Sequence, residues 1–127
     1  MGNRILIIDD EEMVRDSFLL AFEDTEYEAD EAESGEKGVG LLRNAKYDLI
    51  FLDLKMPGMN GVETLIEIRK LDKEVPVYIV TAFHEEFLSK LNELEKHKIS
   101  FELVRKPLGR KEILLITESV LSGPVTL

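Results

Sequence analysis

Three aspartates stand at the ends of two aliphatic runs. Asp9 and Asp10 follow the run at residues 5–8, and Asp53 follows the run at residues 49–52. If both runs are buried parallel strands that lie side by side, the three carboxylates meet at one edge of the sheet. Carboxylates that close repel one another, so such a cluster requires a divalent cation or a proton. The spacing therefore predicts a metal-dependent acidic site.

Two further polar residues, Thr81 and Lys106, stand at the ends of later apolar runs. Each of the five residues also has a purely structural explanation. Asp9 and Asp10 can cap the following helix, whose first turn is acidic. Asp53 can start a turn and Thr81 can cap a helix, and a lysine such as Lys106 usually lies in solvent. All five nevertheless follow predicted strands in four separate segments, which favours one shared site.

Short apolar runs alternate along the chain with segments of helical apolar spacing. The runs predict strands over residues 4–8, 27–32, 47–53, 76–81 and 99–104. The helical spacing predicts helices over about 12–23, after Ser34, and over 62–69, 87–94 and 113–121. The predicted buried stripe of the first helix consists of Met13, Val14, Phe18, Ala21 and Phe22.

Five strand–helix repeats in strict alternation predict an α/β fold with helices on both faces of a parallel sheet. We expect the flavodoxin-like (βα)5 class, a doubly wound sheet in strand order 2-1-3-4-5. In that order, ligands bind beyond the carboxyl ends of strands 1 and 3, which are the strands that end in aspartates. We expect one domain over residues 1–121, with residues 122–127 forming a tail or the start of a linker.

The composition excludes several classes of partner. The 127 residues carry a formal net charge of -10, which argues against direct binding to nucleic acid. No apolar stretch is long enough to cross a membrane, so no membrane partner is expected. The chain has no cysteine, which excludes disulfides and thiolate metal sites and is consistent with a cytoplasmic location.

Magnesium suits the predicted acidic site better than calcium. Mg²⁺ is commonly held by one or two carboxylates, keeps several waters and completes its coordination shell with phosphate oxygens. A carboxylate beside such an ion can attack phosphorus and form an aspartyl phosphate. The remaining requirement of phosphoryl transfer is charge neutralisation, which the metal and a lysine supply.

Four segments together resemble the receiver domain of two-component response regulators, the CheY-like superfamily. They are ILIIDDE at residues 5–11, YDLIFLDLKMPGMNG at 47–61, VPVYIVTA at 75–82 and Lys-Pro at 106–107. The resemblance extends to about residue 121. It implies that Asp53 accepts a phosphoryl group from a phosphohistidine of a sensor histidine kinase or a histidine phosphotransfer protein.

The resemblance also implies a ligand set for Mg²⁺. Asp10 would be a direct ligand beside Asp53, and Asp9 would act mainly through metal-bound water. The backbone carbonyl of Lys55 would be a further ligand. The domain would catalyse only its own phosphorylation and dephosphorylation, so it would not be an enzyme acting on an outside substrate.

Further roles follow from the same resemblance. Thr81 would move toward the phosphate, and Lys106 would pair with it ahead of a cis bond to Pro107. Receivers usually carry Phe or Tyr three residues before this lysine, and the rotation of that ring reports phosphorylation to the surface. Here that switch position is Leu103, and Phe101 lies two residues earlier.

Two positions are expected to tune the lifetime of the phosphoryl group, namely Lys55 and Phe83. A long cation and a bulky ring would hinder an attacking water, so a relatively long-lived phosphoaspartate is expected. Output would pass through the fourth helix, fifth strand and fifth helix to a downstream protein target or an attached effector domain.

Two other functions fit parts of the pattern. A phosphatase of the haloacid-dehalogenase type also uses aspartate and Mg²⁺, but it has a second aspartate two residues after the nucleophile, where this chain has Lys55. A flavin-binding domain would share the fold class. It would need a phosphate-binding loop after the first strand, and the acidic residues at 9–12 would repel phosphate.

Overall fold

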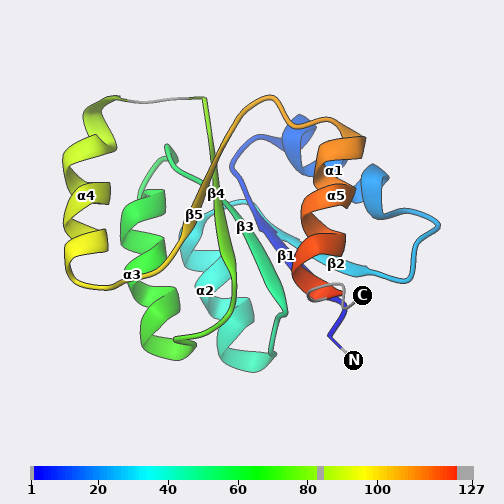
Figure 1. Ribbon diagram of the computed structural model, residues 1–127, viewed down its shortest axis with the longest axis horizontal. Helices are drawn as coiled ribbons and strands as arrows, with labels where there is room; N and C mark the ends of the chain where they lie inside the picture. Colours follow the sequence, from blue (N-terminus) through cyan, green and yellow to red (C-terminus); the bar gives the residue numbers. More distant parts are fainter. Residues whose placement is uncertain (1, 83–84, 123–127) are drawn as a thin grey trace, which may run out of the picture.

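A sheet of five parallel strands runs through the centre of the molecule in the order β2-β1-β3-β4-β5 (Figure 1). The computed structural model describes residues 2–82 and 85–122. The strands are β1 (Arg4–Ile8), β2 (Glu28–Ala32), β3 (Leu49–Asp53), β4 (Val77–Thr81) and β5 (Glu102–Arg105). The helices are α1 (Glu12–Phe22), α2 (Gly35–Asn44), α3 (Gly61–Leu71), α4 (Leu88–Lys96) and α5 (Arg110–Leu121), and a short 3₁₀ helix, η1 (Glu85–Phe87), precedes α4. The predicted flavodoxin-like fold and strand order are confirmed.

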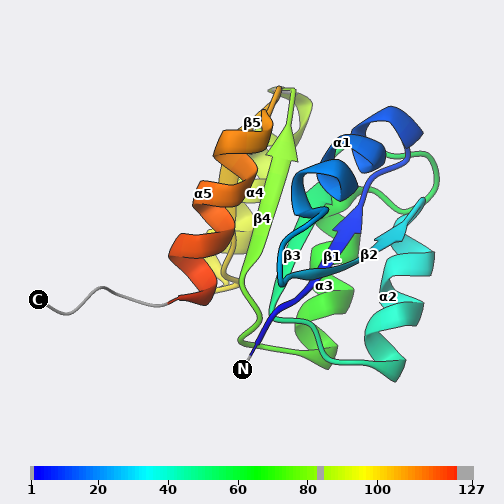
Figure 2. The same cartoon turned by 90° about the vertical axis from the view of Figure 1, so that its right-hand side faces the viewer.

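The helices form two layers around the sheet (Figure 2). The apolar side chains of α1 and α5 pack on one face, where Phe18 and Ile113 belong to one buried cluster with Phe51 of β3. The other face is covered by α2, α3 and α4, with Leu65 and Leu91 in its core. Because both faces are covered, residues 5–8 of β1 and 49–52 of β3 are all apolar and buried, which is typical of central parallel strands.

The register of β1 and β3 positions the acidic residues. Ile8 of β1 pairs with Leu52 of β3, so Asp9, which follows β1, and Asp53, the last residue of β3, reach the same level at the carboxyl edge. The backbone N–H of Asp9 also donates to the carbonyl of Ala32 at the end of β2, at 3.1 Å. The main chain that carries Asp9 is therefore held by the sheet on both sides.

Two predictions about the elements are wrong, namely the burial of Met13 in α1 and the start of the fifth strand. Met13 does not belong to the buried stripe of α1, since 84% of its surface is exposed. Val14 and Phe18, four residues apart, lie on the stripe that faces the sheet, and the neighbouring position 13 is rotated away from it.

The fifth strand begins at Glu102 rather than Ile99 because the preceding residues complete the end of α4. Lys98 has a positive φ of 61°, and its N–H donates to the carbonyl of Glu95 at 3.0 Å. The N–H of Ile99 donates to the carbonyl of Leu94 at 2.9 Å. These two bonds form a helix C-terminal cap of the Schellman type. Ile99 therefore belongs to the C-terminal cap of α4 rather than to the strand.

No helix within residues 2–82 and 85–122 combines the length and the hydropathy that a membrane crossing requires. Phe83, expected to tune the phosphoryl group, and most of the expected tail lie outside the described residues.

Gly61, the first residue of α3, is expected to be essential for the local packing at Asp53. A Cβ at this position would clash with the carbonyl oxygen of Asp53 and lie 2.7 Å from the Cα of Leu54. Both are main-chain atoms of β3 and its end, which cannot move independently of the sheet. We expect Gly61→Ala to reduce the free energy of unfolding by about 2–3 kcal/mol in urea titrations.

A matched control for this prediction is Gly40→Ala in α2, where a Cβ would meet no atom within 4 Å. Alanine favours the helix by about 0.5–1 kcal/mol, so this variant is expected to be at least as stable as the wild type. Equal effects of the two substitutions would contradict the assignment of a close main-chain contact at Gly61.

Candidate functional site

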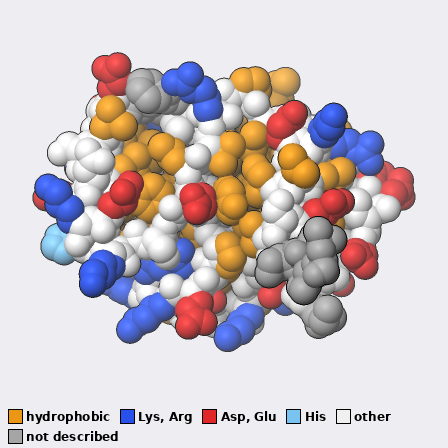
Figure 3. Space-filling model, in the orientation of Figure 1, with side chains coloured by type: hydrophobic (Ala, Val, Ile, Leu, Met, Phe, Trp, Pro, Cys, Tyr) orange, Lys and Arg blue, Asp and Glu red, His pale blue; other side chains and the backbone are white. Residues whose placement is uncertain are grey.

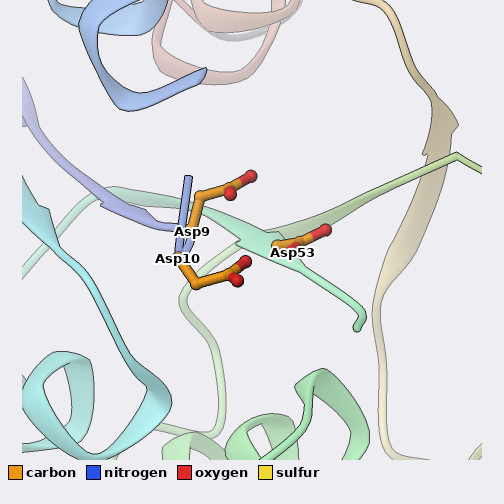
Figure 4. Close-up of side chains that lie close together, drawn as sticks. All are labelled: Asp9, Asp10 and Asp53. Carbon is orange, nitrogen blue, oxygen red and sulfur yellow. The ribbon is translucent and has the colours of Figure 1, made fainter. Parts of the chain in front are cut away.

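Three carboxylates converge at the carboxyl edge of β1 and β3. Asp9 and Asp10 follow β1 and Asp53 ends β3, and their side chains project to the same side (Figure 4). One carboxylate oxygen of each lies within 4.8 Å of those of the other two. Asp9 and Asp53 are buried and Asp10 is exposed. This edge can therefore hold a metal ion that is reached from solvent on the side of Asp10.

Lys106, directly after β5, places its ammonium group between two of the carboxylates. Its Nζ lies 3.1 Å from Oδ2 of Asp9 and 3.1 Å from Oδ1 of Asp53. The backbone N–H of Lys106 donates to the carbonyl of Thr81 at 2.7 Å, which ties the end of β5 to the end of β4. The peptide bond between Lys106 and Pro107 is cis. Thr81 is buried at the end of β4, beside β3.

The electrostatics of the cluster favour a proton or a cation at Asp53. Burial, together with the charge of Asp9, raises the pKa of Asp53 from 3.8 to about 7, although Lys106 acts in the opposite direction. Burial alone would lower the pKa of Lys106. The charges of Asp53 and Asp9 outweigh burial, so the pKa of Lys106 is raised and the ammonium stays charged at neutral pH.

The side-chain oxygens of Asp9 and Asp10 differ in what they bind. Oδ1 of Asp9 accepts a hydrogen bond from the N–H of Glu11 at 2.9 Å, and Oδ2 accepts one from Lys106 at 3.1 Å. Among the described residues, the carboxylate of Asp10 accepts no hydrogen bond and forms no ion pair. Both carboxylate oxygens of Asp10 are therefore available to a ligand.

Arg15 supports the turn that carries these aspartates, a role that the sequence did not reveal. Its Nη1 donates to the carbonyl oxygen of Asp9 at 2.9 Å, and its Nε donates to Oε1 of Glu31 in β2 at 2.7 Å. The hydrogen bond and charge of Glu31 raise the pKa of Arg15 against the effect of burial. Only the packing of α1 beside β2 brings the two groups together, so no local pattern could have indicated the contact.

The remaining predicted residues lie around the site. Lys55 is exposed in the loop after β3, and its Nζ lies 3.3 Å from Oε1 of Glu86 in η1. Leu103 lies on β5 with 48% of its surface exposed, whereas Phe101 is partly buried against the core that includes α4. Sequence reasoning thus identified all three clustered aspartates and Lys106, but it missed Arg15 and Glu86.

Comparison with known sequences gives the family. A family model described as the response regulator receiver domain matches residues 5–118. The transcriptional regulatory protein ResD of Bacillus subtilis is 34% identical over 119 residues, which are 93% of this chain and 48% of ResD. The phosphate regulon transcriptional regulatory protein PhoB of Pseudomonas aeruginosa is 32% identical over 128 residues, 98% of this chain and 55% of PhoB. The chain thus spans about half the length of these two relatives.

Solved structures agree with the sequence comparison. A CheY-like receiver domain protein from Methanospirillum hungatei superposes with a TM-score of 0.82 at 26% identity, with 96% of each chain covered. The response regulator protein TrrA from Thermotoga maritima, solved in complex with Mg²⁺–BeF, gives a TM-score of 0.77 at 32% identity and covers 94% of this chain and 99% of TrrA. Fold, sequence and the clustered strand-end carboxylates agree, and the chain belongs to the receiver domains of two-component response regulators.

Proposed function

We propose that this receiver domain accepts a phosphoryl group on Asp53, in a Mg²⁺-dependent reaction, from a phosphohistidine of a sensor histidine kinase or histidine phosphotransfer protein. The new charge would then change the domain surface and so control a protein target or an attached effector domain. One observation carries the proposal. Asp53 is a buried strand-end carboxylate with two further carboxylates beside it and an ammonium group at 3.1 Å.

The chemistry requires Asp53 as the nucleophile. One of its carboxylate oxygens forms a bond to phosphorus while the bond between phosphorus and the imidazole nitrogen breaks, and the electron pair stays on the nitrogen. The position of Asp53 at the end of β3 fixes the direction from which this oxygen can attack. Lys106 is already within 3.1 Å of Oδ1 and can neutralise charge on the oxygens of the arriving phosphoryl group. Thr81, at the end of β4, would donate its hydroxyl to the same group.

The carboxylates present fit Mg²⁺. Two ligands on opposite sides of this ion are about 4 Å apart, close to the 4.8 Å within which the three aspartates already lie. The free carboxylate of Asp10 suits a direct ligand, and the two engaged oxygens of Asp9 suit a contact through water. Asp53 and the carbonyl of Lys55 would complete the protein ligands. When bound, Mg²⁺ would neutralise the phosphoryl oxygens during transfer. The related TrrA was solved in complex with Mg²⁺–BeF, which supports Mg²⁺ as the ion of this proposal.

The output surface would be formed by α4, β5 and α5. Hydrophobic side chains gather on the face where β4 and β5 lie between α4 and α5 (Figures 1 and 3). Leu103 of β5 is half-exposed on the outer strand, at the position where the family usually has an aromatic ring. A leucine offers no ring to turn inward, so coupling to Thr81 would depend on movement of the η1–α4 segment instead.

We infer a functional unit of residues 1–121, followed by a tail or linker at residues 122–127. Because ResD and PhoB are transcriptional regulatory proteins about twice the length of the match, an effector domain attached to this receiver is a reasonable proposal. The receiver itself would not bind nucleic acid, would act in the cytoplasm and would catalyse only its own phosphorylation and dephosphorylation.

Incubation with acetyl phosphate and MgCl₂, followed by intact-mass measurement, tests the proposal. The wild-type domain is expected to gain one phosphoryl group, and Asp53→Asn is expected to gain none. Asp16→Asn, an exposed aspartate of α1, is the matched control and should be phosphorylated like the wild type. An unchanged wild-type mass at saturating acetyl phosphate, or phosphorylation of the Asp53→Asn variant, would contradict the proposal.

A second test concerns the lifetime of the phosphoryl group. Replacement of Lys55 and Phe83 by serine should remove bulk from the path of an attacking water. We expect the phosphoaspartate of the double variant to hydrolyse on the order of tenfold faster, which corresponds to about 1.4 kcal/mol in the barrier. Decay can be followed by intact mass after removal of acetyl phosphate. Unchanged decay would show that these side chains do not protect the phosphoryl group.

A further inference from the structure

The outer edge of β2, at the opposite end of the sheet from β5, has unused main-chain hydrogen-bonding groups. Among the described strands, β2 pairs only with β1. The N–H of Glu28 donates to Asn3 and the carbonyl of Ala32 accepts from Asp9, so these alternate residues face β1. The N–H and C=O groups of Ala29 and Glu31 therefore point away from the sheet. Such an edge can accept another strand.

A groove of about 550 Å³ runs beside this edge. Its lining comes from α1, the end of β2 and α2, and includes Arg15, Glu31 and Gly40. The lining also contains two ion pairs, one between Arg15 and Glu31 and one between Glu33 and Lys37. The groove is thus continuous with the free strand edge and has charged side chains at its border.

Gly40 keeps the groove open at a position where the isolated domain gives no reason for glycine. A Cβ at Gly38, in the same helix, would press against the side chain of Ile8, so Gly38 is required by internal packing. A Cβ at Gly40 would meet no atom within 4 Å. Glycine in the interior of a helix is unfavourable, and it permits the close approach of another main chain. The position therefore suits contact with a second polypeptide.

The net charge of the segment around β2 indicates which kind of partner polypeptide would bind there. Residues 9–36, which form the β1–α1 turn, α1, β2 and the start of α2, contain thirteen acidic residues and one basic residue, a net charge of −12. The other 99 residues carry a net charge of +2, so the charge of the whole chain arises from this segment. A second copy of β2 would be repelled from the edge, and a cationic chain would be attracted.

We propose that the edge of β2 and the groove beside it dock an extended, Lys/Arg-rich segment of a partner protein. The segment adds a strand to β2 through the groups of Ala29 and Glu31 and crosses the open surface at Gly40. Main-chain hydrogen bonds provide affinity and the acidic surroundings provide selectivity. The surface is separate from the phosphorylation site and from the face formed by α4, β5 and α5.

Binding of a defined peptide to the ¹⁵N-labelled domain tests this proposal. The probe is a ten-residue peptide that alternates Lys or Arg with Val, and the control replaces every basic residue by Glu. The basic peptide should shift the amide signals of residues 28–33 and 37–44 and slow hydrogen exchange at Ala29 and Glu31. The acidic peptide should leave all signals unchanged.

Gly40→Leu separates docking in the groove from general electrostatic attraction. The new side chain meets no neighbour at Cβ, so the variant should fold with an equal or higher Tm, yet it should weaken binding of the basic peptide at least tenfold. Ser119→Leu on the exposed surface of α5 is the matched control and should bind like the wild type. Unchanged binding by Gly40→Leu, shifts spread over all acidic residues, no binding, or peptide-free self-association through β2 would each overturn the proposal.

Discussion

At pH 8 and without divalent cations, Asp53→Asn is expected to be more stable than the wild-type domain by about 1–3 kcal/mol. Burial and the charge of Asp9 raise the pKa of Asp53 from 3.8 to about 7 in the folded state, so folding disfavours its ionised form. Each pKa unit corresponds to about 1.4 kcal/mol, which sets a ceiling of roughly 4 kcal/mol. The expected gain in stability is smaller than this ceiling because Lys106 has one carboxylate partner fewer in the variant.

The sign of the pH dependence follows from the same pKa values. A carboxyl group whose folded pKa lies above its unfolded value stabilises the protein at low pH, and this contribution is lost as pH rises from about 4 to about 7. The difference between the variant and the wild type should therefore be small near pH 4 and reach its maximum above pH 7. Urea unfolding in EDTA at several pH values measures this difference in unfolding free energy.

Addition of MgCl₂ provides the control for the stability of Asp53→Asn. The cation should stabilise the wild-type domain more than the variant, since it binds the folded state through a carboxylate that the variant lacks. The difference in unfolding free energy should then decrease. A variant that is less stable than the wild type at pH 8 in EDTA would contradict the electrostatic description of the site.

Lys106→Met is expected to have the opposite effect, a loss of about 3 kcal/mol at pH 8 in EDTA. The ammonium lies within 3.1 Å of both Asp9 and Asp53, two buried carboxylates. Methionine retains most of the volume but leaves both charges without this partner, which is strongly destabilising in a buried site. Urea unfolding at pH 8 measures the loss, and lower pH should restore part of it by protonating Asp53.

Two further variants distinguish the loss of charge from the loss of packing at Lys106. The double variant Asp53→Asn with Lys106→Met should be much less destabilised than Lys106→Met alone, because only one buried carboxylate then lacks its partner. Lys70→Met removes a cation that pairs with Glu67 at 2.8 Å on the exposed surface of α3, and it should change stability by less than about 0.5 kcal/mol. Additive effects in the double variant would indicate that packing dominates.

Much of the site was predictable because its residues follow strongly apolar strands. The runs that precede Asp9 and Asp53 identify central parallel strands, and strand order places their ends together. Lys106 was predictable because it follows the last strand of the alternating pattern, although the start of that strand was not. That error arose because Lys98 adopts a positive φ without being Gly or Asn, so the residue type gave no signal for the helix cap.

Other features depend on contacts between segments that are distant in sequence. Arg15 supports the carbonyl of Asp9 only because the end of β2 brings Glu31 beside α1. The exposed position of Met13 depends on which rotation of α1 packs against the sheet. Likewise, the acidic composition of residues 9–36 is visible in the sequence, but its arrangement around a free strand edge and the groove at Gly40 is not.

The sequence by itself determined the alternation of strands and helices, the doubly wound sheet and the four strand ends at which polar residues stand. Local apolar periodicity is sufficient for this, since it distinguishes buried strands from amphipathic helices. Only the tertiary structure decided how the charges interact: the 3.1 Å contacts of Lys106, the free oxygens of Asp10 and the raised pKa of Asp53. Electrostatic energies depend on distance and burial in three dimensions, and neither quantity is encoded by residue type alone.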